Sequence, residues 1–151
     1  MIDRNHLARL VLIPMVFTVP GLVGAQDAQG VLTVEVQNIK NDTGQIGCSL
    51  FANADGFPNK SDKALDVVFV PPKARKATCV FKNVKPGTYA VSVMHDLDKD
   101  GSLDSSLMGR PKEPWAVSNN APVERFGPPK FDAAKFRFDG EIKTIKVKLA
   151  L

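Results

Sequence analysis

Apolar residues recur at every second position along most of the chain, which is the spacing of half-buried β-strands. In the stretch 31–39, Leu32, Val34 and Val36 alternate with polar side chains. The same two-residue period marks further stretches at 45–52, 65–70, 77–84, 88–95, 136–138 and 141–151. Glycine, proline, asparagine and aspartate, which favour turns, separate these stretches. Because the turn-rich segment 38–44 joins the first two, the sequence predicts that they form a hairpin.

These short strands, with no helical run of ten or more residues, predict an all-β chain. We expect an antiparallel β-sandwich of about seven strands, transthyretin-like or immunoglobulin-like, in one domain over residues 26–151. The segment Pro86-Gly87-Thr88-Tyr89 couples a type II turn to a strand led by tyrosine. It resembles the transthyretin-like and carboxypeptidase-regulatory sandwich domains, and that resemblance supports the architecture alone.

One long segment, 105–131, has no hydrophobic period. Prolines at positions 111, 114, 122, 128 and 129 and glycines at 109 and 127 hold it out of regular structure. Structureless segments of this length are uncommon in compact domains and are often functional. We therefore expect one long irregular loop that contributes to function.

Residues 1–25 have the pattern of a cleavable signal peptide. Arg4 and Arg9 lead into an almost wholly apolar run from Leu10 to Val19, and the segment ends in small residues at Ala25. Prolines interrupt the run, which falls short of the ~20 residues that a membrane-spanning helix needs. The sequence predicts export with cleavage, to the periplasm or the outside of the cell.

Two cysteines, Cys48 and Cys79, fall on the predicted inward faces of different strands. An even pair in an exported chain predicts a disulfide bond. The alternatives are two buried thiols or a redox pair, and the Cys-x-x-Cys spacing of a redox pair is absent. A structural bridge is therefore favoured.

The chain is mildly basic, with 20 lysines and arginines, 16 acidic residues and a formal net charge of +4. Its basic residues form no dense run with interleaved aromatic residues, so we expect no nucleic-acid interface. A solvated basic face that keeps the protein soluble accounts for them.

The densest chemical pattern follows the stretch 88–95. Asp96, Asp98, Asp100 and Asp104 occupy positions 1, 3, 5 and 9 of a calcium-type loop, with the carbonyl of Ser102 at position 7. The glutamate that an EF-hand places at position 12 is missing, and no helices flank the loop. The sequence therefore predicts a weak calcium site of the extracellular kind, Ca²⁺ being the one candidate cofactor. The alternative is an acidic turn whose aspartates cap their own backbone amides.

The long loop also carries four candidate ligand-binding residues, Arg110, Trp115, Asn119 and Asn120. Exposed aromatic, amide and cationic groups of this kind suit a sugar or a peptide. The alternative for Trp115 is that its indole plugs the end of the sandwich.

Catalytic constellations are otherwise missing from the sequence. His95 is the one histidine that remains after signal cleavage, and its place in the alternation directs it inward. An enzyme using His95 with Asp96 can be drawn, as can an acid–base pair of Asp96 and Glu113, although any two carboxylates would serve as well. The chain has no zinc-type cluster, nucleophile motif or phosphate-binding glycine loop. We therefore expect no enzymatic activity.

Four motifs stand along the chain, namely His95-Asp96-x-Asp98-x-Asp100-Gly101, Leu107-Met108-Gly109-Arg110-Pro111, Ser118-Asn119-Asn120-Ala121 and Gly127-Pro128-Pro129-Lys130-Phe131. Together they resemble a group of bacterial exported proteins, domain of unknown function 2141. The resemblance covers nearly all of the mature chain and implies a periplasmic or secreted β-sandwich of unassigned biochemistry. The family pattern has asparagine at one or more of the positions of Asp98 and Asp100, so the extra carboxylates here favour a cation. It also has Gly-Tyr in place of Pro114-Trp115, which leaves the shape of the long loop open.

The sequence thus predicts an exported, non-catalytic binding or structural module, with a cell-envelope protein or glycan as candidate partner. The alternative function is a carbohydrate- or peptide-binding module that uses the loop 105–131.

Overall fold

The computed structural model describes residues 29–125 and 127–150. The predicted signal peptide, residues 1–25, lies outside the described residues. Within the described part of the chain, no helix combines the length and the apolar character needed to cross a membrane.

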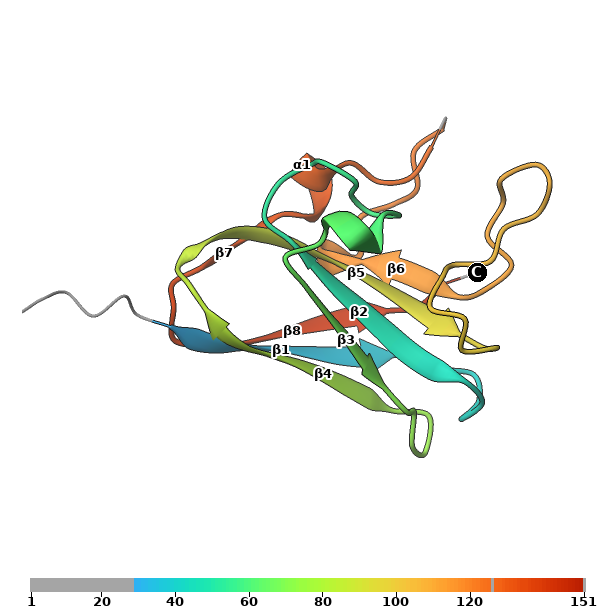
Figure 1. The fold of residues 1–151 in the computed structure, drawn as a ribbon, viewed down its shortest axis with the longest axis horizontal. Coiled ribbons are helices and arrows are strands. Elements are labelled where there is room, and N and C mark those ends of the chain that lie inside the picture. Colours follow the sequence, from blue (N-terminus) through green and yellow to red (C-terminus); the bar gives the residue numbers. More distant parts are fainter. Residues whose placement is uncertain (1–28, 126, 151) are drawn as a thin grey trace, which may run out of the picture.

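Two β-sheets lie face to face and enclose the core between them (Figure 1). The three-stranded sheet has the order β4 (Ala77–Val84), β1 (Gly30–Gln37), β8 (Ile142–Lys148). The five-stranded sheet has the order β3 (Asp66–Val70), β2 (Gln45–Phe51), β5 (Gly87–Asp96), β6 (Trp115–Val117), with β7 (Phe136–Phe138) paired to β5 as well. The predicted all-β sandwich is confirmed.

The predicted hairpin of β1 and β2 is wrong. β1 pairs with β4 and β8, whereas β2 pairs with β3 and β5, so the link 38–44 crosses from one sheet to the other. At the start of this link Asn38 has φ 62° and its side-chain amide donates to the carbonyl of Leu149 at 2.7 Å, and Ile39 is buried. The chain therefore turns into the sandwich after β1 instead of folding back beside it. β1 and β8 run parallel, so the sandwich is not purely antiparallel.

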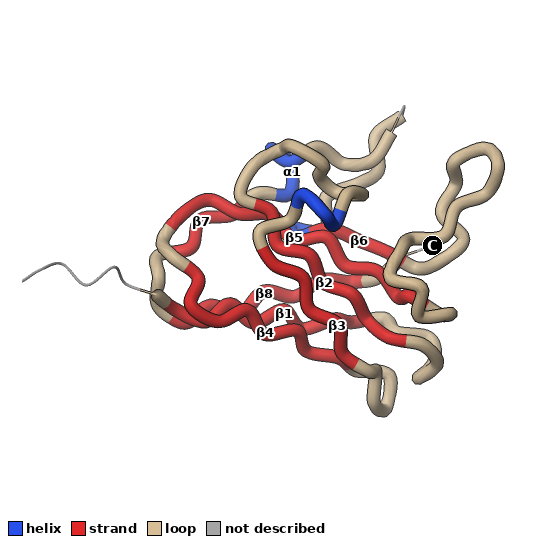
Figure 2. Tube along the Cα trace, in the orientation of Figure 1, coloured by secondary structure: helices blue, strands red, loops and turns tan. Residues whose placement is uncertain are grey.

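The long segment 105–131 contains more regular structure than its sequence predicts (Figure 2). It includes β6 and the 3-10 helix η2 (Ser118–Asn120), and its last residue begins the short helix α1 (Phe131–Ala134). The buried Ser118 hydroxyl accepts a hydrogen bond from the Val91 amide at 2.9 Å and donates to the carbonyl of Ala134 at 2.7 Å. This hydroxyl ties η2 and α1 to β5. The residues of β6, Trp115-Ala116-Val117, are all apolar and show no alternation, which is why this strand is not visible in the sequence.

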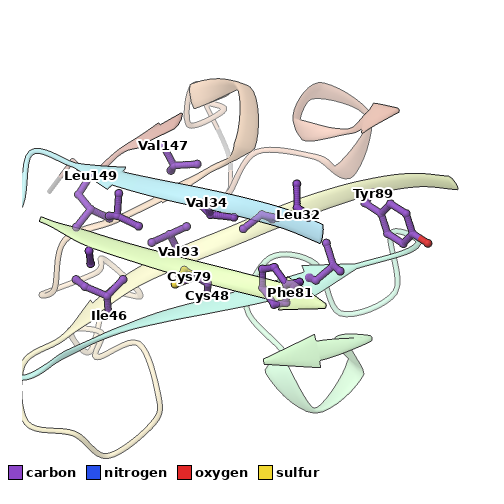
Figure 3. Close-up of a cluster of buried hydrophobic side chains, with 14 of the residues drawn as sticks. Leu32, Val34, Ile46, Cys48, Cys79, Phe81, Tyr89, Val93, Val147 and Leu149 are labelled. Carbon is purple, nitrogen blue, oxygen red and sulfur yellow. A yellow bond between two sulfur atoms is a disulfide. The ribbon is translucent and has the colours of Figure 1, made fainter. Parts of the chain in front are cut away.

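The core is filled from alternate positions of both sheets (Figure 3). Leu32, Val34 and Val36 are buried, as predicted. Alternate residues of β2 (Ile46, Cys48, Leu50) and of β5 (Tyr89, Val91, Val93) are buried as well, together with Val147 and Leu149 near the C-terminus. Cys48 of β2 and Cys79 of β4 form a disulfide that links one sheet to the other, as predicted. The sheets are therefore joined covalently at the centre of the core.

A second, smaller apolar cluster covers part of the outer face of the five-stranded sheet. Ala90 of β5, Val117 and Ala134 form its buried centre. Phe57 lies against it, with its ring edge-to-face with those of Phe51 and Phe131 at centroid distances of 5.3 and 5.7 Å. Segments on this side, including the loop with the 3-10 helix η1 (Ser61–Lys63), overhang the sheet and create the hollow described below.

Candidate functional site

Three carboxylates come together where β5 ends and β6 begins. Asp96 is the last residue of β5, Asp98 lies in the following turn, and Glu113 stands two residues before β6. β5 and β6 are antiparallel, with Met94 opposite Trp115, so the residues just beyond these two strand ends lie side by side. One carboxylate oxygen of each acidic residue lies within 4.8 Å of the others. Asp96 and Glu113 are 0% and 3% exposed, whereas Asp98 is exposed.

Asp96 is held in its charged form by hydrogen bonds. Its Oδ2 accepts from the Gln45 side chain at 2.7 Å and from the Gly101 amide at 3.0 Å, and its Oδ1 accepts from the Asp100 amide at 3.2 Å. Burial raises the pKa of Asp96, but the hydrogen bonds from Gln45 and from the backbone amides of Gly101, Lys99 and Asp100 outweigh it, and the pKa is lowered overall. The carboxylate therefore ionises readily and shapes the turn that follows β5.

Glu113 joins the two ends of the turn 97–104. Its Oε1 accepts the Leu97 amide at 2.7 Å, and its Oε2 accepts the Asp104 amide at 3.1 Å. The Lys112 amide, next to it in sequence, donates to the Asp104 carbonyl at 2.8 Å. One buried side chain thus closes the base of the loop between β5 and β6.

The acidic group retains free acceptor capacity for a cation. A carboxylate oxygen has two lone-pair directions, and each Glu113 oxygen accepts one backbone hydrogen bond. Asp98 uses its Oδ1 for the Asp100 amide at 3.2 Å and is open to solvent. Charged oxygens arranged in this way match the ligand preference of Ca²⁺ and Mg²⁺, which are hard cations.

The structure keeps part of the predicted calcium set together. Asp96 and Asp98 belong to the acidic group, whereas the carboxylates of Asp100 and Asp104 lie outside it. The Asp100 carboxylate accepts the Ser102 amide at 2.7 Å, which is the turn-capping role of the alternative interpretation. Metal binding itself stays a prediction.

Glu113 belongs to the acidic group but is not part of the calcium-type loop pattern in the sequence. It lies nine residues beyond Asp104, where a calcium-loop pattern gives no signal. Its proximity to Asp96 follows from the pairing of β5 with β6. A sequence-based prediction that β5 pairs with β6 would have placed Glu113 beside Asp96.

His95 lies apart from this group. Its ring is buried on the core face of β5, as expected, and alternation along the strand turns the Asp96 side chain to the other face. His95 Nε2 lies 2.7 Å from the Thr43 carbonyl oxygen, which can only accept, so Nε2–H is the donor. Nδ1 is buried and makes no hydrogen bond with the described residues. The imidazole therefore anchors the link between β1 and β2.

The four predicted ligand-binding residues divide into two pairs. Arg110 and Trp115 line one hollow of about 670 Å³ on the outer face of the five-stranded sheet. Asn119 donates through its side chain to the carbonyls of Ala133 and Lys135, at 3.3 and 3.0 Å, and Asn120 accepts the amide of β8 at Lys148 at 2.8 Å. The two asparagines thus support the backbone of neighbouring segments and do not line this hollow, although Asn120 and Trp115 both line a second, smaller hollow of about 390 Å³.

Trp115 forms a wall of the hollow and does not enter the core between the sheets. Its indole is half-buried and packs against the outer-face cluster of Ala90, Val117 and Ala134. Its backbone exchanges hydrogen bonds with Ala150 at 2.8 and 3.1 Å. The side chain is thus fixed in place and partly accessible.

Comparison with known protein families gives a match. A family described as an uncharacterized protein conserved in bacteria, DUF2141, matches residues 34–146. No curated protein and no solved structure matches the chain. The matched range runs from β1 into β8 and includes the acidic group and both cysteines. The chain therefore belongs to the DUF2141 family.

Proposed function

We propose that this protein is an exported, non-catalytic binding or structural module that holds a divalent cation, with Ca²⁺ the best match, at the strand-to-loop junction. The observation that carries this proposal is the group of Asp96, Asp98 and Glu113, three carboxylates within 4.8 Å, two of them buried. A bound cation would join the first turn of the loop to its last residues, and so fix the segment that overhangs the sheet.

The donor chemistry favours calcium over transition metals. All three candidate ligands are carboxylate oxygens, whereas zinc sites typically use histidine and cysteine. Carboxylates bind a metal in their charged form, and the amides around Asp96 lower its pKa and so keep it charged. Backbone carbonyls and water would complete a shell of six to eight oxygens, as in extracellular sites with dissociation constants of roughly 10⁻⁴–10⁻³ M.

Export is supported by the signal-peptide pattern of residues 1–25 and by the disulfide Cys48–Cys79. Disulfides of this kind persist in oxidising, extracytoplasmic compartments. A non-catalytic role is supported by the burial of His95, whose Nε2 is engaged by a backbone carbonyl.

Thermal unfolding in the presence and absence of calcium tests the proposal. With a dissociation constant of about 1 mM, ~10 mM Ca²⁺ stabilises the fold by roughly 1.4 kcal/mol. We expect Tm to rise by about 5 °C for a domain of this size. The mature chain, after chelator treatment and dialysis, is the appropriate sample.

Two variants of matched exposure separate the acidic group from the loop spacing. Asp98→Asn removes one charge from the group, and we expect it to abolish most of the calcium-dependent rise in Tm. Asp100→Asn lies on the same turn and outside the group, and its amide oxygen still accepts the Ser102 amide, so the rise should persist. If the Tm of the wild type does not rise at ~10 mM Ca²⁺, the proposed cation site is wrong and the turn is purely structural.

A second candidate function, a ligand-binding module, is favoured by a separate observation. Arg110 and Trp115, two of the residues predicted to bind a sugar or peptide, line the same hollow. This function does not require the cation, although the loop that the acidic group shapes supplies part of the wall of the hollow.

A further inference from the structure

We infer that the hollow on the outer face of the five-stranded sheet is a binding site for an acidic saccharide. This inference rests on the second candidate function and names its ligand class. The volume of about 670 Å³ lies within the range of about 300–1,000 Å³ that is typical of small-molecule sites.

The floor of the hollow consists of side chains that point outward from paired strands. Ser49 of β2 lies directly opposite Ser92 of β5, and Gly47 lies opposite Met94 in the next outward-facing row. All four residues line the hollow. The small side chains of Ser49 and Ser92 leave room above this part of the sheet, whereas the side chains of Phe69 and Met94 cover Gly47, at 2.8 and 3.0 Å from where a Cβ atom would lie.

The Ser49 hydroxyl identifies the floor as a polar contact surface. The residue is 9% exposed, and within residues 29–125 and 127–150 its side chain has no hydrogen-bond partner. A hydroxyl that lines a hollow and makes no hydrogen bond within the protein is free to donate to a ligand and to accept from it. Such a group is stabilised by a polar ligand or by water and is a poor contact for a purely apolar ligand.

The walls combine a flat apolar surface with further hydroxyl groups. Trp115 stands beside Met94 across the β5–β6 pair and offers a half-buried indole. Ser61, Ser102 and Ser105, from the loops around the sheet, also line the hollow. The face of a sugar ring, which carries C–H groups, fits an indole, and its hydroxyls fit serine side chains.

The charge at the mouth selects an anionic ligand. Arg110 lines the hollow, is exposed, and makes no ion pair with the described residues. The acidic side chain that lines the hollow, Glu124, is already paired with Lys130 at 3.5 Å. A guanidinium binds a carboxylate through two parallel hydrogen bonds, so a sugar acid satisfies Arg110 where a neutral sugar does not.

Binding can be followed through Trp115, because it is the one tryptophan in the sequence. We would titrate the protein with digalacturonate and with its neutral counterpart galactobiose, and record tryptophan fluorescence. A saturable change with digalacturonate, and weaker binding of galactobiose, is the expected result. The absence of a saturable change with either sugar overturns the inference.

Two variants with a matched control test the named contacts. Arg110→Gln should weaken digalacturonate binding about tenfold and leave galactobiose binding unchanged, because one charge-assisted contact is lost. Ser49→Ala should weaken binding of both sugars and leave Tm unchanged or higher, because its hydroxyl makes no hydrogen bond in the free protein. Lys112→Gln removes a nearby charge that does not line the hollow, and it should bind as the wild type does. If Arg110→Gln and Ser49→Ala bind both sugars as tightly as the wild type, the site lies elsewhere and the inference is wrong.

Each titration is repeated in chelator and in ~10 mM Ca²⁺, well above the weakest extracellular affinities. Sugar binding in chelator supports the hollow even where the cation proposal fails. A calcium-dependent rise in Tm without sugar binding supports the cation and overturns the saccharide site.

Discussion

At the scale of single residues, Asp96 and Glu113 are buried carboxylates whose charge is stabilised by the backbone around them. Asp96 accepts amides from the turn 99–101, and Glu113 accepts amides from both ends of the turn 97–104. Buried charges are retained in proteins where hydrogen bonds satisfy their oxygens. These two residues therefore determine the path of the chain after β5, whether or not a cation is bound.

Replacing Glu113 tests this role directly. In Glu113→Gln, the amide oxygen can accept one of the two backbone amides, but the amide nitrogen faces the other donor. We expect the free energy of unfolding in chelator to fall by about 1–3 kcal/mol, the cost of a buried unsatisfied group. Urea unfolding measures the change. The control Glu124→Gln removes an exposed, ion-paired carboxylate and should cost less than about 1 kcal/mol, so an equal loss in both variants would contradict the role given to Glu113.

The lowered pKa of Asp96 predicts that the stability of the fold depends on pH. Its pKa in the folded protein is lowered below the ordinary value of 3.8, so its contribution is fully present above that value. The contribution is lost as the pH falls from 3.8 toward the folded-state pKa, because the unfolded chain then binds the proton more readily. NMR titration of the side-chain carboxyl carbon of Asp96 should give a midpoint below 3.8. A midpoint at or above 3.8 would mean that burial, and not hydrogen bonding, dominates at this site.

At the scale of elements, the acidic group depends on the link between β1 and β2 as well as on β5 and β6. Gly44, at the end of that link, has φ 75°, and a Cβ atom placed there would lie 2.2 Å from the Asp96 carbonyl oxygen. Gln45, the next residue, donates its side-chain hydrogen bond to Asp96. The close approach of Gly44 therefore keeps the first residues of β2 against the end of β5.

A pair of glycines with similar dihedral angles isolates the effect of this approach. Gly109 has φ 72° and no atom within 4 Å of an added Cβ, so Gly109→Ala should cost only the left-handed conformation, about 1 kcal/mol. Gly44→Ala should cost about 2 kcal/mol more, because backbone atoms of Asp96 and Leu97 must move. Chemical denaturation measures both. If both variants lose the same free energy of unfolding, the close contact of Gly44 with β5 does not affect stability.

The strands and their inward faces could be predicted from the sequence, because alternation reports which side chains avoid water. Alternation places Cys48 and Cys79 on inward faces, where they form the disulfide. Alternation does not report which strand is a neighbour of which. The crossing of the link 38–44 between sheets, the parallel pairing of β1 with β8 and the short β6 therefore come only from the structure.

The same limit applies to the candidate site. Asp96 and Asp98 are close in sequence and could be predicted together, whereas Glu113 joins them through strand pairing. Likewise, Arg110 and Trp115 meet at the hollow because loops fold over β2 and β5. The floor residues Ser49 and Ser92 carry no sequence signal, since serine is a common residue on the outer face of a strand.

At the scale of the whole molecule, the disulfide between β2 and β4 links the two sheets through the core. The bridge closes a segment with a sequence separation of 31 residues, which the chain-entropy account values at about 3–4 kcal/mol. We expect the double variant Cys48→Ala, Cys79→Ala to lose about this much in the free energy of unfolding in urea. A double variant as stable as the oxidised wild type would contradict the role of the bridge.

The acidic group and the hollow share the loop between β5 and β6. The acidic group holds the two ends of this loop together, and residues from its middle line the hollow. Figure 1 shows the loop projecting beyond the ends of β5 and β6. The loop contributes Asp98 and Glu113 to the acidic group and Arg110 to the lining of the hollow. A cation at the junction would therefore stabilise the same segment that forms a wall of the hollow.

Calcium titration by isothermal calorimetry tests the central claim most directly. The mature wild-type protein, freed of metal with a chelator, should bind one Ca²⁺ per chain with a dissociation constant of roughly 10⁻⁴–10⁻³ M. Asp98→Asn should bind at least about tenfold more weakly, because it loses one of three charged ligands, and Asp100→Asn should bind as the wild type does. No saturable binding by the wild type up to ~10 mM Ca²⁺, or equal binding by Asp98→Asn, would contradict a cation site at Asp96, Asp98 and Glu113.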